Sequence, residues 1–273
     1  MTLLGTGFRV GLKPLAVLRP HERTIPRHVD KIAEEIRRDG IQKDPIIVDE
    51  ETGVVLDGMH RLAAFKKLGL EAAVCCSVPY SSPSIAVSRW ARVYRAPGQS
   101  EAMSLVRDAG IGKKVSLEDA FAGLESKRAG VAAFTGGGAY VLDSAPELDS
   151  AFPMVDSLDR AAEANGWERK FVPEDEADFE MQDTKNVVVM VRRITKDDVV
   201  SAAKTGKLFP CKTSMHSIDP RPVSIRFLLS DMTEPRTRSF TELFDGKEAA
   251  ILSPGSVYEG RRYKEKLLVL RQP

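Results

Sequence analysis

The sequence is poor in cysteine, which argues against stabilisation by disulfides or by a zinc site. Its 273 residues include three cysteines, Cys75, Cys76 and Cys211, and no pair has the Cys-x-x-Cys spacing of a zinc site. Cys75 and Cys76 lie in an apolar run, residues 72–78, that predicts a buried strand. We therefore expect buried thiols in a reducing cytoplasm, not disulfides or redox chemistry.

The chain also lacks an excess of either charge. It has 40 basic and 39 acidic residues, a net charge of +1, whereas a broad nucleic-acid surface needs a basic excess. No apolar run reaches the roughly 18 residues of a membrane helix. Residues 3–18 are interrupted by Arg9, Lys13 and Pro14, so they are a poor signal peptide. These features predict neither a nucleic-acid nor a membrane partner.

The familiar nucleotide motifs are missing as well. Gly112-Lys113 and Gly206-Lys207 both lack the upstream glycine and the trailing hydroxyl of a P-loop. No Gly-x-Gly-x-x-Gly follows a strand, which argues against a Rossmann site. The signatures of a protein-kinase catalytic loop and of a serine nucleophile elbow are absent too.

The first 80 residues show an alternation of short strands and amphipathic helices. Val29, Ala33 and Ile36 recur at helical spacing within 27–39, and Gly40 is a typical helix stop. Strands are expected over 15–18, 45–48, 54–56 and 72–78, and a second helix is expected to end at Gly69. The pattern predicts an α+β fold whose first module covers residues 1–80.

The remainder, 81–273, is expected to form a second α/β domain. Its beginning, 85–124, has a mainly helical pattern, and Gly136-Gly137-Gly138 predicts the turn of a hairpin. Further helices are expected over 154–165 and 197–204, and strands over 131–134, 139–142, 186–191, 223–229, 249–252 and 266–270.

The most informative segment is Asp57-Gly58-Met59-His60-Arg61, where a strand meets a helix N-terminus. That position favours anions, because backbone N–H groups and the helix dipole both point outward. Arg61 adds a planar fork for phosphate, and Asp57 is suited to a metal or a proton. An alternative is that Asp57 caps the helix while His60 and Arg61 make surface contacts.

Two further segments carry reactive groups. Pro20-His21-Glu22 places a carboxylate between a strand and a helix, where it can accept a proton from a hydroxyl or simply complement the helix dipole. The segment 206–222 holds lysines, hydroxyls, a histidine and an arginine among three prolines. Such donors suit phosphate or an α-carboxylate, although a plain surface loop is the alternative.

Asp57–Arg61 with Pro20-His21-Glu22 upstream resembles the ParB/sulfiredoxin-like fold, and Phe209–His216 narrows the resemblance to the free L-serine kinases. The resemblance covers residues 12–80 and 195–230. It implies that ADP or ATP phosphorylates free L-serine to O-phospho-L-serine with Mg²⁺, and that the product serves cysteine biosynthesis. It also implies an active-site cleft between the two domains.

The resemblance assigns roles residue by residue. Glu22 corresponds to the catalytic base, and Asp57 to a second essential carboxylate that orients Mg²⁺. The expected nucleotide and phosphate ligands are Gly58, Met59, His60, Arg61 and Lys212, and the expected substrate ligands are Thr213, His216, Arg221 and Trp90.

Two positions depart from the family pattern. Met59 stands where members often have a histidine, and Met215 stands where an arginine usually precedes the histidine. Another hydroxylated metabolite is therefore an alternative acceptor. A ParB-like nucleotide- or DNA-binding regulator without turnover is a further alternative. Sulfiredoxin activity is disfavoured, because Met59 replaces the thiol that this chemistry needs.

Overall fold

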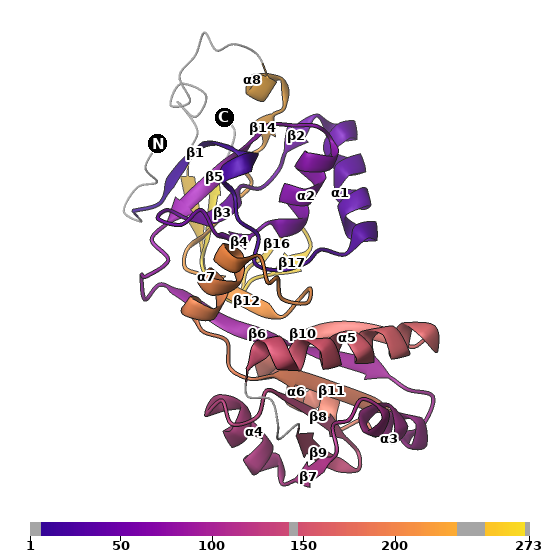
Figure 1. Ribbon diagram of the computed structural model, residues 1–273. Helices are drawn as coiled ribbons and strands as arrows, with labels where there is room; N and C mark the ends of the chain where they lie inside the picture. The colour runs from indigo at the N-terminus through magenta and orange to yellow at the C-terminus, as the bar shows by residue number, and fades with distance from the viewer. Residues whose placement is uncertain (1–6, 142–146, 234–248, 271–273) are drawn as a thin grey trace. The chain divides into compact units, whose positions relative to one another are not determined.

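The computed structural model describes residues 7–141, 147–233 and 249–270 (Figure 1). The chain forms two compact units. The first contains Met1–Ala86, Val200–Leu208 and His216–Pro273, and the second contains Val87–Val199 and Phe209–Met215. The division differs from the uninterrupted domain expected over 81–273, because the chain after His216 rejoins the first unit. Long-range strand pairing causes this return, and no local sequence pattern reveals it.

A four-stranded sheet with the order β1-β5-β3-β4 forms the centre of the first unit. Its strands are β1 (Arg9–Pro14), β3 (Ile46–Asp49), β4 (Val55–Asp57) and β5 (Ala72–Val78). The inner strands β3 and β5 are parallel, whereas β1 and β4 pair antiparallel with them at the two edges.

Two helices, α1 (Pro26–Asp39) and α2 (Met59–Lys67), lie side by side against this sheet (Figure 1). In α1 the buried residues Val29, Ala33 and Ile36 share one face and join a core with the sheet. Burying an aliphatic side chain of this size contributes about 1.5–3 kcal/mol. Gly40, with φ +63°, ends the helix in the left-handed conformation, as the sequence predicted.

The C-terminal part of the chain adds short strands to the first unit. A three-stranded sheet has the order β13-β18-β15, and β14 pairs with β2. The segments of this part are β13 (Arg221–Val223), β14 (Phe227–Leu228), α8 (Ser230–Thr233), β15 (Ala249–Leu252), β16 (Val257–Tyr258), β17 (Arg261–Arg262) and β18 (Leu267–Leu270), and β2 (Ile41–Gln42) follows α1. The strand β12 (Ser214–Ile218) belongs to the first unit from His216 onward.

The centre of the second unit is a sheet with the order β10-β6-β11-β8-β9-β7. The five pairings along this order are antiparallel. Its strands are β6 (Ile85–Arg95), β7 (Lys113–Val115), β8 (Val131–Thr135), β9 (Gly138–Val141), β10 (Glu168–Pro173) and β11 (Asn186–Val191). Its helices are α3 (Gln99–Asp108), α4 (Leu117–Glu125), α5 (Leu148–Ala164) and α6 (Ala177–Met181). The helix α7 (Lys196–Thr205) begins in the second unit, and its residues from Val200 onward belong to the first. The expected mixed fold is thereby confirmed.

Three local predictions are wrong. Leu15–Val17 is a 3-10 helix and no strand. Ile85–Arg95 is a long strand, although the sequence indicated a helix, because its buried Arg89 and Arg92 disguise the alternation of apolar residues. The strand expected over 223–229 is split in two. Ser224 and Arg226 cause the split, since both have positive φ, which a strand does not accommodate. Leu142, the expected end of the hairpin, lies outside the described residues.

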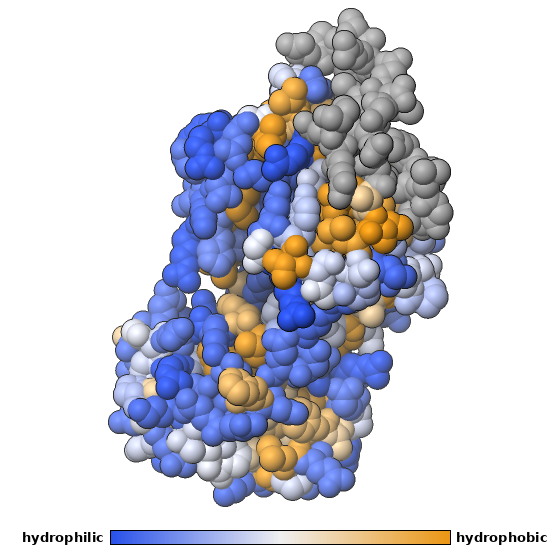
Figure 2. Space-filling view, turned by 180° about the vertical axis from the view of Figure 1, so that it is seen from behind, coloured by the Kyte–Doolittle hydropathy of each residue, from blue (hydrophilic) through white to orange (hydrophobic). Residues whose placement is uncertain are grey.

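The two adjacent cysteines are buried and unbridged in β5, as expected. Burial raises the pKa of the Cys75 thiol to about 12 and raises the pKa of Cys76 as well. On the face drawn in Figure 2 the surface is mostly hydrophilic, and apolar side chains gather in small patches. Among the described residues, no helix combines the length and apolar character needed to cross a membrane.

Candidate active site

The turn between β4 and α2 is built as the sequence predicted. Gly58 has φ +98°, a conformation that glycine adopts readily, and it is the N-cap of α2. Met59, His60 and Arg61 form the first turn of the helix, where backbone N–H groups have no partner within the helix. This turn therefore presents the backbone donors that suit an anion.

Asp57 at the end of β4 is paired with two guanidinium groups. Its Oδ2 accepts hydrogen bonds from Arg221 at 3.0 Å and from Arg61 at 3.4 Å. Arg221 is buried and also donates to Glu265 and, at 2.6 Å, to the backbone oxygen of His216. Burial alone would lower the pKa of Arg221, but Asp57 and Glu265 raise it above its ordinary value. Arg221 thus joins the β4–α2 turn to the segment that carries His216.

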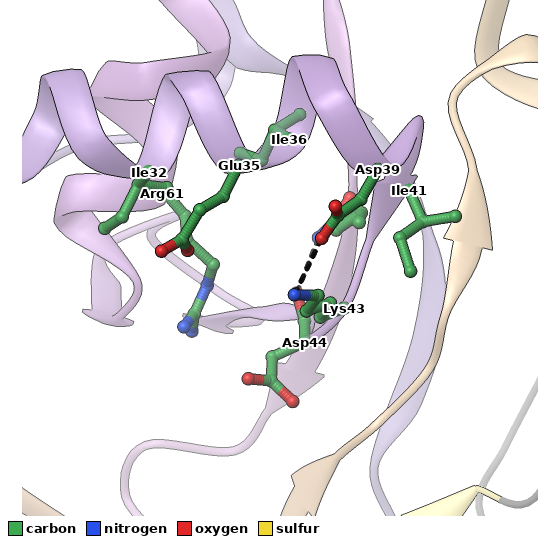
Figure 3. A pocket seen from close by; sticks show the side chains of 9 residues that line it. Ile32, Glu35, Ile36, Asp39, Ile41, Lys43, Asp44 and Arg61 are labelled. Atoms are coloured by element: carbon green, nitrogen blue, oxygen red, sulfur yellow. Dashed lines mark hydrogen bonds and ion pairs between the residues drawn. The ribbon is translucent and has the colours of Figure 1, made fainter. Parts of the chain in front are cut away.

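Arg61 also makes contacts away from Asp57 and Arg221. Its guanidinium donates to the backbone oxygen of Pro45 at 3.0 Å and lines a pocket of about 140 Å³ beside α1. Figure 3 shows Arg61 and Glu35 pointing into that pocket, next to the Asp39–Lys43 ion pair. Arg61 therefore supports Asp57 and the backbone at Pro45 through the bonds that it makes here.

His60 fixes the loop that carries Glu22. Its Nε2 accepts a hydrogen bond from the backbone N–H of Ile25 at 3.0 Å, and its ring lies 5.8 Å from that of His28. An Nε2 that accepts cannot carry a proton, so the neutral ring has its proton on Nδ1. The β4–α2 turn and the Glu22 loop are thereby connected by one bond.

Glu22 is 6% exposed and follows His21, which is fully buried. The Nε2 atom of His21 lies 3.8 Å from a carboxylate oxygen of Glu22. Nδ1 lies 2.8 Å from the backbone oxygen of Val55 in β4, and a carbonyl can only accept, so Nδ1 carries a proton. Burial lowers the pKa of His21, while Glu22 opposes that effect.

His216 lies against the same segment. Its Nε2 is 2.8 Å from the hydroxyl of Tyr80, and its ring meets that of His21 edge-on at a centroid distance of 5.5 Å. The contacts of His60 and His216 place both histidines on the 21–25 segment: His60 bonds the backbone of Ile25, and His216 packs on His21.

The remaining predicted residues lie in the second unit. Lys212, with φ +57°, places its Nζ 4.9 Å from the centre of the Trp90 ring, a cation–π contact. The hydroxyl of Thr213 donates to the backbone oxygen of Pro210 at 2.7 Å and accepts from Arg92 at 3.2 Å. These bonds of Thr213 hold the loop that presents Lys212.

Met59 and Met215, the two departures from the family pattern, lie in different surroundings. Met59 packs against the apolar core of the first unit, so its side chain adds no phosphate donor and only its backbone belongs to the turn. Met215 is partly buried in β12, and its backbone oxygen accepts a 3.4 Å bond from the Ser88 hydroxyl.

Mg²⁺ has no protein-only site among the described residues, because no three histidine, cysteine or acidic side chains gather there. A Mg²⁺ ion that arrives with a nucleotide needs only one or two carboxylates and keeps water and phosphate oxygens as its other ligands. Asp57, whose side chain is 38% exposed, fits this limited role.

Sequence reasoning missed three partners of these residues. His21 was visible beside Glu22, but nothing in the sequence indicated complete burial. Tyr80 and Glu265 carry no local signal, because only the fold brings Tyr80 to His216 and Glu265 to Arg221.

The chain is similar to several known proteins. No family model matches the chain. It is 40% identical over 76 residues to a ParB-like protein of Sulfolobus acidocaldarius, covering 28% of the chain and 38% of that protein. It is 34% identical over 77 residues to an ATP-dependent L-serine kinase of Staphylothermus marinus, covering 27% and 31%. These two matches span only about a third of the relatives' length.

A longer match covers most of the chain. Over 222 residues it is 22% identical to the ADP-dependent L-serine kinase SerK of Thermococcus kodakarensis, covering 79% of the chain and 89% of SerK. A solved structure of a free serine kinase variant in complex with ADP superposes with a TM-score of 0.70 at 19% identity, over 82% of this chain and 93% of that one. The chain has the free serine kinase fold. The predicted resemblance is thereby confirmed, including its ParB-like part.

Proposed function

We propose that this protein transfers a phosphoryl group from ADP or ATP to the hydroxyl of free L-serine. One observation carries the proposal: in a chain with the serine kinase fold, the His60–Ile25 hydrogen bond ties the Glu22 loop to the phosphate-binding turn of α2. A base and an anion site are the two parts that phosphoryl transfer needs from a protein, since its catalysis is mostly positioning and charge stabilisation.

Glu22 is the base in this account. Its carboxylate accepts the proton of the serine hydroxyl while the serine oxygen bonds to the terminal phosphorus. The bond from that phosphorus to the bridging oxygen breaks, and a nucleotide with one phosphate fewer leaves. The burial of Glu22 protects the proton transfer from competing water.

The turn at Gly58 holds the phosphates. The N–H groups of the first turn of α2 and the Nδ1–H of His60 are donors there, and Arg61 and Arg221 add positive charge while they orient Asp57. Mg²⁺, when bound with the nucleotide, neutralises charge on the phosphate oxygens, and Asp57 is the residue that would hold it.

We assign the other predicted residues to substrate and phosphate binding. Lys212 supplies a cation to the nucleotide, and Trp90 keeps that cation in place. His216 and Arg221 bind the amino acid, and Thr213 acts through the Lys212 loop. We propose a cytoplasmic location, where the nucleotides are available, and cysteine biosynthesis as the use of the product.

The test is incubation of the pure protein with Mg²⁺, L-serine and either ADP or ATP, with mass spectrometric detection of O-phospho-L-serine. The donor that is consumed decides between ADP and ATP. Phosphorylation of another hydroxylated metabolite in place of serine would favour the alternative that Met59 and Met215 suggest. Nucleotide binding without any phosphorylated product would favour the ParB-like regulator.

A further inference from the structure

Behind Glu22 the first unit contains a buried imidazole that the reaction as described does not use. His21 is fully buried, and its Nδ1–H donates to the Val55 carbonyl, so the tautomer is fixed. The lone pair of Nε2 is thereby directed to the other side of the ring, where the Glu22 carboxylate lies 3.8 Å away.

The contact between His21 Nε2 and the Glu22 carboxylate, at 3.8 Å, is longer than a hydrogen bond. A carboxylate and an imidazole lone pair cannot form a hydrogen bond until one of them receives a proton. One added proton, with a closer approach of the two side chains, converts the contact into a hydrogen bond in a buried site, where such a bond is strong. A proton taken up by Glu22 can therefore be held by both groups.

We propose that the general base is the His21–Glu22 pair and that His21 holds the proton that Glu22 takes from the substrate. The proposal rests on the proposed function and deepens it. The serine hydroxyl gives its proton to a Glu22 oxygen as its own oxygen bonds to phosphorus. The new O–H then donates to Nε2 of His21. The proton returns to solvent after the phosphorylated product leaves, so no other co-reactant is needed.

The surroundings of His21 allow this role. Among the described contacts, the titratable groups that face its ring are Glu22 and His216, and His216 is itself bonded to Tyr80. On β4, Asp57 is engaged by Arg221 and Arg61. Glu22 is therefore the carboxylate that contacts His21 among these groups, which makes their coupling measurable.

Two substitutions separate the two nitrogens of His21. His21→Asn keeps a donor at the place of Nδ1 for the Val55 carbonyl and removes Nε2. His21→Gln keeps a polar atom near the place of Nε2 and removes the donor to Val55. We expect His21→Asn to lower kcat about 10-fold and to move the acid limb of the pH–rate profile down by about one pH unit, because protonated Glu22 loses its partner. His21→Gln should lose more stability and shift the limb less.

A loss of kcat with the acid limb unchanged in His21→Asn would overturn the proposal, because a merely structural role of His21 affects the rate and not the proton affinity of the base. A second measurement needs no activity. The titration of His21 is followed by NMR in the wild type and in Glu22→Gln, which is tractable with four histidines in the chain. We expect the pKa of His21 to fall by at least about one unit in Glu22→Gln.

These readouts distinguish the two proposals. An unchanged His21 titration in Glu22→Gln would refute the pair even if the protein makes phosphoserine. A shifted titration in a protein that phosphorylates no serine would support the pair as a proton-binding site and refute the proposed reaction instead. If His21→Asn does not fold, the His21 titration in the wild type and in Glu22→Gln still tests the proposed pair.

Discussion

The backbone N–H of Ile25 donates to Nε2 of His60 at 3.0 Å, and this bond connects the Glu22 loop with the β4–α2 turn. The histidine therefore acts through its acceptor nitrogen. A mutation that removes the acceptor should uncouple the loop from the turn, even though Ile25 and His60 lie far apart in the sequence.

We expect His60→Ala to lose about 1–3 kcal/mol of unfolding free energy, because it leaves a partly buried N–H without its acceptor. Activity should fall more steeply than stability, since the base loop is released. His60→Gln offers a side-chain oxygen in place of Nε2 and should restore most of the stability. Urea unfolding of the three proteins measures the difference, and equal stability of all three would show that the bond contributes nothing.

Asp57→Asn should reduce turnover more than serine binding. The amide keeps the size of the carboxylate but removes the charge that orients Arg221 and assists Mg²⁺. Arg221 retains Glu265 as a counter-ion, so the fold should survive. Steady-state kinetics at varied Mg²⁺, together with serine affinity from calorimetry, test this. If serine affinity and turnover fall equally, or the protein melts, Asp57 has a structural role.

Lys212→Met should lower kcat/KM for the nucleotide about 10- to 100-fold, as expected for the loss of a charged hydrogen bond to phosphate. Lys204→Met is the matched control, because Lys204 is an exposed lysine near the end of α7. Nucleotide kinetics on both variants give the comparison. If kcat/KM for the nucleotide is similar in the two variants, Lys212 does not bind phosphate.

The stability of the protein should fall on acidification below the ordinary histidine pKa of 6.5. Burial lowers the pKa of His21 in the folded state, so the unfolded chain binds this proton first as the pH falls. The contribution is fully present above pH 6.5 and is lost between 6.5 and the lower folded-state pKa, by up to about 1.4 kcal/mol per pH unit. Urea unfolding between pH 8 and 5 should show a shallower loss for His21→Asn. If the unfolding free energy of the wild type and of His21→Asn falls equally with pH, the loss of stability does not come from His21.

The parts of the molecule that local chemistry controls could be predicted from the sequence. The periodic apolar face and the stop at Gly40 define α1, and the β-branched run before Asp57-Gly58 defines the β4–α2 turn. The strand β6 was missed because Arg89 and Arg92 are buried by partners distant in sequence.

The candidate site also has residues that the local sequence predicts and contacts that it does not. Glu22, Asp57 and Arg61 carry chemistry that spacing and residue type reveal. The burial of His21 and the bond between Tyr80 and His216 depend on tertiary packing, which a single sequence does not display. The return of the chain to the first unit after His216 is likewise a consequence of long-range strand pairing, because β14 pairs with β2.

The central claim, phosphorylation of free serine with Glu22 in the base, is tested most directly by one assay. Wild type and Glu22→Gln are incubated with Mg²⁺, L-serine and ADP or ATP, and O-phospho-L-serine is quantified by mass spectrometry. Glu22→Gln keeps size and hydrogen bonding but cannot accept the proton. We predict phosphoserine from the wild type and a rate about 10²–10⁴ lower from the folded variant. No phosphoserine from the wild type with either donor, or a variant as fast as the wild type, would contradict the account.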